Sequence, residues 1–179
     1  MEIVAGLSRG EVWAADALYD RVQTAVDRTL RRLLRSFGSE HDDLVQAVFE
    51  RILRVLSERP LAQSYDLPAW ASVVALRVAL DALRRKNREQ RLFQSLPDEL
   101  GSGGELDRRI EARSELVRVQ GVVARMKSKY VETVLLHDVL GHDLVEIAEL
   151  TQVSVAAAQS RLVRGRKELL KRIAQEKSR

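Results

Sequence analysis

Apolar residues recur every three or four positions through most of this 179-residue chain, and this spacing constrains the fold more than any other feature. The first such stretch runs from about Gly10 to Phe37, and two more follow at about Asp42–Glu58 and Pro68–Arg91. Residues at this spacing share one face of an α-helix, so each stretch predicts an amphipathic helix. Runs of alternating β-branched residues are absent from the sequence. We therefore expect an all-α fold.

One cluster of Gly, Ser and Pro residues divides the chain. It reads SLPDELGSGGE from Ser95 to Glu105, a composition typical of a flexible linker. We expect a first domain at residues 1–95, a linker at 96–109 and a second domain at 110–179. Helical spacing in the second half predicts further helices at about residues 107–125, 128–139, 143–150 and 154–175. The expected architecture is two small helical domains on a flexible linker, with a helix-turn-helix in the second.

Residue content disfavours several classes of protein. The chain has no Cys, which excludes disulfides and thiolate metal sites. His41, His137 and His142 fit no metal-binding spacing, and the sequence has no nucleophile–base pair, phosphate-cradling Gly loop or HExxH motif. It also lacks a secretion signal and any 18-residue apolar run. We expect a cytoplasmic protein that is not an enzyme, with no metal, no cofactor and no membrane insertion.

Two basic segments lie far apart in the sequence. Residues 77–91 hold six Arg or Lys against two acidic residues, and residues 159–179 hold eight against two. Two such segments are what a protein needs to bind a polyanion at two sites. The same cations can instead be solvated side chains near helix ends, where the helix dipole favours positive charge. Charge alone leaves nucleic-acid binding open.

Residues 143–166 have the pattern of a helix-turn-helix. A helix at 143–150 is followed by a short break at Thr151–Val153, and Ser154 offers a hydroxyl cap for the next helix. The predicted core positions of that second helix are Val155, Ala158, Leu162, Gly165, Leu169 and Ile173. Gln152 occupies the turn position that is usually Gly, and an ordinary helical hairpin with a basic outer face is the alternative interpretation.

The outer face of the second helix has side chains suited to a DNA groove. Gln can bond adenine, Ser can bond bases or phosphate, and Arg can bond guanine or phosphate. Small side chains let the backbone approach the groove, and Val can touch thymine methyl groups. The candidate DNA-contacting residues are Ala157, Gln159, Ser160, Val163, Arg164 and Lys167.

Four sequence blocks together resemble the extracytoplasmic-function (ECF) sigma factors, the small members of the sigma-70 class. SVAAAQSRLVRGR is similar to the family's S-x-G-T-V-K-S-R-L-x-R-A-R, and HDLVEIAEL is similar to L-S-Y-E-E-I-A-E-x-L. DDLVQAVFERILRVL resembles E-D-L-V-Q-E-V-F-L-R-L-L, and LPAWASVVALRVALDALRRKNRE resembles F-R-A-W-L-Y-R-I-A-R-N-L-A-I-D-L-L-R-R-R-x-R. The blocks occur in the family's order and cover nearly the whole chain.

The resemblance implies binding partners for the chain and a different role for each of its two domains. In the family, the first domain binds the clamp helices of the largest subunit of core RNA polymerase, and it recognises and melts the −10 promoter element. The second domain sits on the β flap and reads the −35 element of promoter DNA through its helix-turn-helix. An anti-sigma factor is the further partner that the resemblance implies.

Two groups of first-domain residues acquire roles from this resemblance. The first group is a stripe of polar side chains beside a broad apolar stripe, and such a surface suits docking on polymerase helices. Taken alone, the polar stripe is more simply interpreted as a solvated helix face. Its residues are Asp43, Gln46, Glu50, Arg51 and Arg54. The −10 candidates combine cations that can track phosphates with polar loop groups that can capture a flipped base. They are Ser64, Tyr65, Arg77, Arg84, Arg85 and Arg88. We expect Trp70 to pack in the core and Asp81 to pair with a nearby Arg.

The chain departs from the family's pattern in three places. Leu76-Arg77 replaces Arg-Asn, Met126-Lys127 replaces Leu-Pro, and Ala156–Ala158 replaces Gly-Thr-Val. Two alternative functions therefore stay open. One is a helix-turn-helix regulator that binds a two-fold symmetric duplex without polymerase, and the other is a diverged sigma-like adaptor that uses no promoter.

Overall fold

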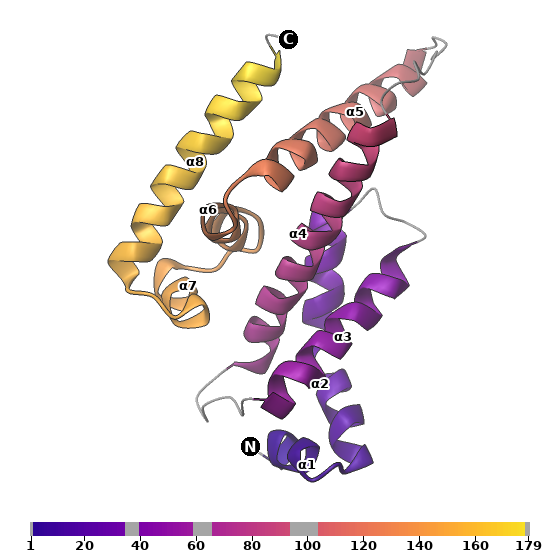
Figure 1. Cartoon of the computed structure of the whole chain (residues 1–179), viewed down its shortest axis with the longest axis vertical. Helices are drawn as coiled ribbons and strands as arrows, with labels where there is room; N and C mark the ends of the chain where they lie inside the picture. Colours follow the sequence, from indigo (N-terminus) through magenta and orange to yellow (C-terminus); the bar gives the residue numbers. More distant parts are fainter. Residues whose placement is uncertain (1, 35–39, 59–65, 94–103, 178–179) are drawn as a thin grey trace. The chain divides into compact units, whose positions relative to one another are not determined.

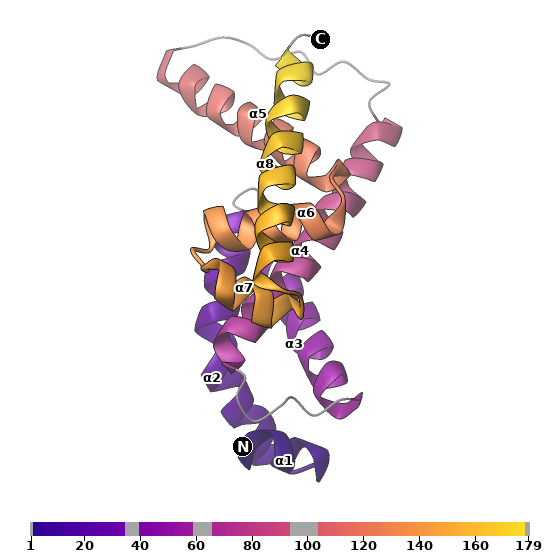
Figure 2. The ribbon, with the colours of Figure 1, turned by 90° about the vertical axis from the view of Figure 1, so that its left-hand side faces the viewer.

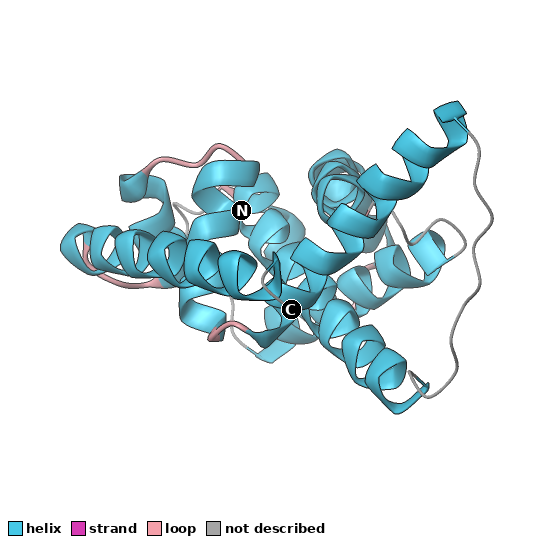
Figure 3. Ribbon diagram, turned by 90° about the horizontal axis from the view of Figure 1, so that it is seen from above, coloured by secondary structure: helices cyan, strands magenta, loops and turns pink. Residues whose placement is uncertain are grey.

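The computed structural model describes residues 2–34, 40–58, 66–93 and 104–177, and within these ranges every regular element is helical (Figure 1, Figure 3). The predicted all-α fold is confirmed. By backbone proximity the chain divides into two compact units, Met1–Ala79 with Glu149–Gln152 and Leu80–Ala148 with Val153–Arg179. No helix in the described ranges is long and apolar enough to cross a membrane.

The chain begins with a helix that the sequence pattern did not predict. This helix, α1 (Glu2–Ser8), ends in a turn where Gly10 has a φ of +73°, and α2 begins only at Val12. Helix α2 therefore begins two residues later than the start predicted at about Gly10. A Cβ on Gly6 would lie 2.7 Å from the Cβ of Ala14, so a glycine at this position lets α1 approach α2 closely.

Helices α2 (Val12–Leu33) and α3 (His41–Glu58) each bury one apolar stripe. The buried residues fall almost every fourth position, which places them on one face of each helix. They are Ala14, Leu18, Val22, Val26, Thr29, Leu30 and Leu33 in α2, and Leu44, Val48, Ile52 and Leu56 in α3. The Tyr19 and Phe49 rings lie 4.6 Å apart between their centroids and join the two helices.

Helix α4 (Leu67–Phe93) is buried almost all round in its first half. Pro68 lies in its first turn, where its missing N–H leaves no bond unmade. Trp70 is only 9% exposed, which confirms the prediction that it packs in the core. Further along the helix, Asp81 and Arg84 form an ion pair at 3.3 Å, as predicted for Asp81.

The second half of the chain forms α5 (Gly104–Arg125), α6 (Ser128–Val134), a π-helical turn η2 (Leu135–Val139), α7 (Leu144–Thr151) and α8 (Val155–Lys177). These elements match the predicted helices closely. Helix α5 begins three residues before the expected start, inside the predicted linker, because good helix-forming residues follow Gly104. The rest of that linker, up to residue 103, lies outside the described residues.

The predicted helix-turn-helix is present in α7, a three-residue turn and α8. Asp143 caps α7 by accepting hydrogen bonds from the N–H groups of Val145 and Glu146, both at 2.8 Å. The predicted cap of α8 is confirmed, since Ser154 Oγ accepts a hydrogen bond from the Ala157 N–H at 3.2 Å. Between the helices, Gln152 has a φ of +55°, in the left-handed region that favours glycine.

A close helix contact joins α6 to α8 at Gly165. A Cβ on this residue would lie 2.6 Å from Val134 Cγ2 and 2.9 Å from the Tyr130 carbonyl oxygen. The Tyr130 carbonyl belongs to the backbone and cannot rotate away. Glycine therefore sets the distance between the two helices.

We expect Gly165→Ala to lower the free energy of unfolding by about 1–3 kcal/mol, because the added methyl group overlaps a backbone atom. Gly121→Ala is the matched control, since the nearest atoms to a Cβ there are side-chain atoms at 3.5 Å. That variant should be neutral or raise stability by up to about 1 kcal/mol, because alanine favours helix. Urea titration followed by circular dichroism measures both. Equal effects of the two substitutions would contradict the close contact.

The left-handed conformation of Gln152 leads to a second prediction about stability. Gln152→Gly should raise the free energy of unfolding by about 1 kcal/mol, and Gln152→Val should lower it by about the same amount. The reason is that only glycine adopts the left-handed conformation without a steric penalty. Urea titration measures both changes. Gln23→Gly, inside α2, is the control and should lower stability by a similar amount. If Gln152→Gly destabilises the protein as much as Gln23→Gly does, the turn does not hold the strain inferred here.

Candidate nucleic-acid interface

Helix α8 has one face fixed against the domain and another open to solvent. Ala158 and Leu162 are buried, as is Gly165, and α6 packs against this side of the helix (Figure 2). The outer side carries the six residues predicted to contact DNA. Gln159, Val163, Arg164 and Lys167 are exposed, and Ala157 and Ser160 are half-buried at its border. The structure thus places all six predicted side chains along one accessible surface.

One predicted core position of α8 is wrong. Val155 is 43% exposed, because it is the first residue of the helix and precedes the segment that packs against α6. Leu169 and Ile173, in the later turns, are half-buried rather than buried. The apolar anchoring of α8 is therefore concentrated in its first three turns, next to the candidate DNA-contacting residues.

An ion pair fixes the middle of α8 to the π-helical turn η2. Arg166 Nε donates to Asp138 Oδ2 at 2.9 Å, a second guanidinium nitrogen bonds Oδ1, and His137 Nδ1 lies 2.8 Å from the same carboxylate. The Arg166 hydrogen bond, aided by His137, holds the pKa of Asp138 below its usual value. A further ion pair, between Arg125 and Glu176, joins the end of α5 to the end of α8.

The cations of α4 form a second candidate surface. Arg77, Arg85 and Arg88 are exposed, while Arg84 is half-buried and paired with Asp81. Arg77, Arg84 and Arg88 follow each other at intervals of seven and four residues, so they lie along one side of the helix. The predicted loop residues Ser64 and Tyr65 lie outside the described residues.

The polar stripe predicted on α3 is accessible along its whole length. All five of its residues are exposed, and Gln46 Nε2 donates to Glu50 Oε1 at 3.0 Å. Leu53 also belongs to this surface. It has the spacing of a core residue, but it is 39% exposed and lies three residues after Glu50. Single exposed apolar side chains are common on protein surfaces, so Leu53 adds apolar area to the stripe without by itself identifying a binding surface.

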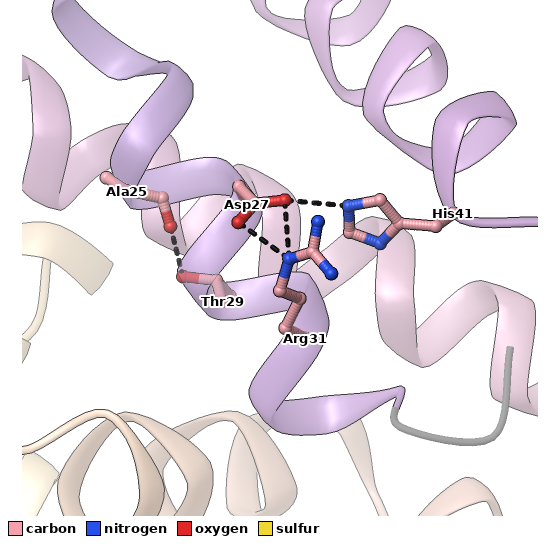
Figure 4. A network of polar contacts seen from close by, with 5 residues as sticks. All are labelled: Ala25, Asp27, Thr29, Arg31 and His41. Carbon is pink, nitrogen blue, oxygen red and sulfur yellow. Dashed lines mark hydrogen bonds and ion pairs between the residues drawn. The ribbon is translucent and has the colours of Figure 1, made fainter. Parts of the chain in front are cut away.

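A polar network holds the start of α3 against α2 (Figure 4). Asp27 accepts a hydrogen bond from Arg31 Nε at 2.8 Å and lies 2.8 Å from His41 Nε2. The Arg31 contact first, and His41 second, lower the pKa of Asp27. The network orients the helix that carries the α3 stripe. His41 therefore has a structural partner, and no cluster of possible metal ligands occurs among the residues with described positions.

The chain matches two family models in the order in which its helices occur. Residues 18–89 match sigma-70 region 2, which spans most of α2 and all of α3. Residues 116–169 match sigma-70 region 4, which includes the helix-turn-helix and the exposed face of α8. Together the two matches cover the three candidate surfaces.

Relatives and a solved structure agree with these matches. The RNA polymerase sigma factor SigZ of Bacillus subtilis is 27% identical over 72% of this chain and 69% of its own length. The ECF RNA polymerase sigma factor SigE of Mycolicibacterium smegmatis is 26% identical over 94% of this chain and 66% of its own length, just under two thirds. CnrH, solved in complex with the cytosolic domain of CnrY, has the same fold, with a TM-score of 0.53 at 22% identity over 97% of this chain and 96% of CnrH. The chain belongs to the ECF branch of the sigma-70 family and is an RNA polymerase sigma factor.

Proposed function

We propose that the protein directs promoter-specific initiation with a separate surface for each task. The α8 face reads the −35 element, and the α4 cations act with Ser64 and Tyr65 on the −10 element. The α3 stripe binds the clamp helices of the largest polymerase subunit, and the second domain docks on the β flap. In this proposal the domains are residues 1–95 and 110–179, joined by residues 96–109.

The main observation behind this proposal is that α8 has one buried side and one exposed side. Its inner side is anchored at Ala158, Leu162 and Gly165, so the helix cannot rotate without breaking packed contacts. Its outer side then presents Gln159 and Arg164 at a fixed angle. A rigid helix that projects an amide and a guanidinium side chain is suited to base edges in the major groove.

The α3 stripe supports the polymerase-binding part of the proposal. The stripe contains acidic, basic and amide side chains together with the exposed Leu53. The opposite face of the helix is buried in the core. Surfaces of this composition favour a specific protein partner, because the apolar contact gives affinity and the charges set the register.

We also propose that an anti-sigma protein inhibits this factor. CnrH, which shares the fold, was solved with a bound protein domain. Since two of the surfaces proposed here must reach polymerase and DNA, a partner that covers either one would block initiation.

Run-off transcription with purified core polymerase and promoter fragments tests the function. We expect the protein to bind core polymerase and to direct initiation from specific start sites. A helix-turn-helix regulator would instead bind a symmetric duplex without polymerase, and an adaptor would bind polymerase without directing initiation. Failure to bind core polymerase or to initiate transcription would contradict the proposal.

Arg164→Ala separates DNA reading from polymerase binding. Loss of one base or phosphate contact should reduce promoter-specific initiation by roughly 10- to 100-fold, and leave the affinity for core unchanged. The reciprocal variant is Glu50→Arg on α3, which should weaken core binding by about tenfold or more, equivalent to about 1.4 kcal/mol. Both affinities are measured by fluorescence with labelled core. Equal loss of core binding and initiation in Arg164→Ala would count against the assigned face.

A further inference from the structure

A group of cations lies beside the DNA-reading helix but on a different element. Lys127 and Lys129 are exposed at the start of α6, and the Tyr130 N–H donates to the Lys127 carbonyl at 3.0 Å within the same turn. The contact between Gly165 and the Tyr130 backbone places this turn directly against α8. Two sequence-distant parts of the domain therefore contribute to one surface.

The Tyr130 ring is the point at which these cations meet. Lys129 Nζ lies 5.1 Å from the ring centroid, and Arg164 of α8 is hydrogen-bonded to the phenol. The Arg164 hydrogen bond lowers the pKa of Tyr130, and the positive charges of Lys129, Arg164 and Lys127 lower it further. One half-exposed ring therefore interacts with cations from the start of α6 and from α8.

This cluster, defined as Lys127, Lys129 and Arg164 around Tyr130, has uncompensated charge. No ion pair joins any of its three cations to a carboxylate within the part of the chain that the structure describes. Neighbouring Arg166 and Arg172, by contrast, are each paired with an acidic residue. Like charges near one another repel, so an anion that binds at this cluster would stabilise it.

We propose that Lys127 and Lys129 bind backbone phosphates of duplex DNA next to the bases that α8 contacts. Tyr130 acts as a positioning residue, because its hydroxyl group orients the Arg164 guanidinium toward the same groove. The inference rests on the proposed reading of promoter DNA by α8. It explains one departure from the family pattern, since Lys127 adds a cation where the family usually has proline. The ligand class is phosphate diester, and the contact is independent of base sequence.

The test measures how salt affects binding of the full-length chain to a short fluorescent DNA duplex of arbitrary sequence. Each lost phosphate contact should reduce the slope of log affinity against log salt concentration by about 0.9. We therefore expect Lys127→Ala/Lys129→Ala to reduce the slope by about 2 and to weaken binding equally for any duplex sequence. Lys127→Arg/Lys129→Arg should keep the wild-type slope, and circular dichroism checks that each variant is folded.

The matched control removes two exposed cations from α2, Arg21→Ala/Arg28→Ala, and should leave the slope unchanged. The inference is overturned if the lysine variant keeps the wild-type slope, if the control loses as much, or if the wild-type chain shows no salt-dependent duplex binding. Core binding and run-off transcription by the same variants separate the two proposals. A wild-type chain that initiates normally while the lysine variant keeps its slope refutes the phosphate site alone, whereas failure to bind core refutes the proposed function.

Discussion

The close contact between α6 and α8 at Gly165 is the constraint on which the second half of this protein depends. No larger side chain fits there, because the Tyr130 carbonyl and Val134 occupy the space that a Cβ needs. The contact fixes both the distance and the rotation of α8, and the Arg166–Asp138 ion pair supports it one residue further along. The face of α8 that we propose contacts DNA is exposed as a direct consequence.

Much of this arrangement could be predicted from the sequence, because local rules determine it. Helical spacing located α2 to α8 to within a few residues, and the caps at Asp143 and Ser154 follow from their side-chain oxygens. Helix α1 could not be predicted in the same way. Seven residues are too few to show a periodic pattern, and the helix depends on a tertiary contact through Gly6.

The missed site residues have a common physical cause. Leu53 has the spacing of a core residue, and only the position of the neighbouring helices leaves it exposed. Tyr130 gains significance from Arg164, which is 34 residues away in the sequence but adjacent in the fold. Pattern analysis finds side chains that share one helix face, whereas surfaces built from two elements require the packing. The family resemblance supplied roles for residues, and the structure supplied their accessibility.

The central claim, that the outer face of α8 reads promoter DNA during initiation, is tested most directly by photocrosslinking from position 163. Val163 is 61% exposed in the middle of this face, and a photoreactive amino acid there leaves the packed side of the helix intact. In the complex of this protein with core polymerase and a promoter that it transcribes, we expect crosslinks to the DNA around the −35 element. Crosslinks from position 163 to polymerase subunits alone, in a complex that initiates normally, would contradict it.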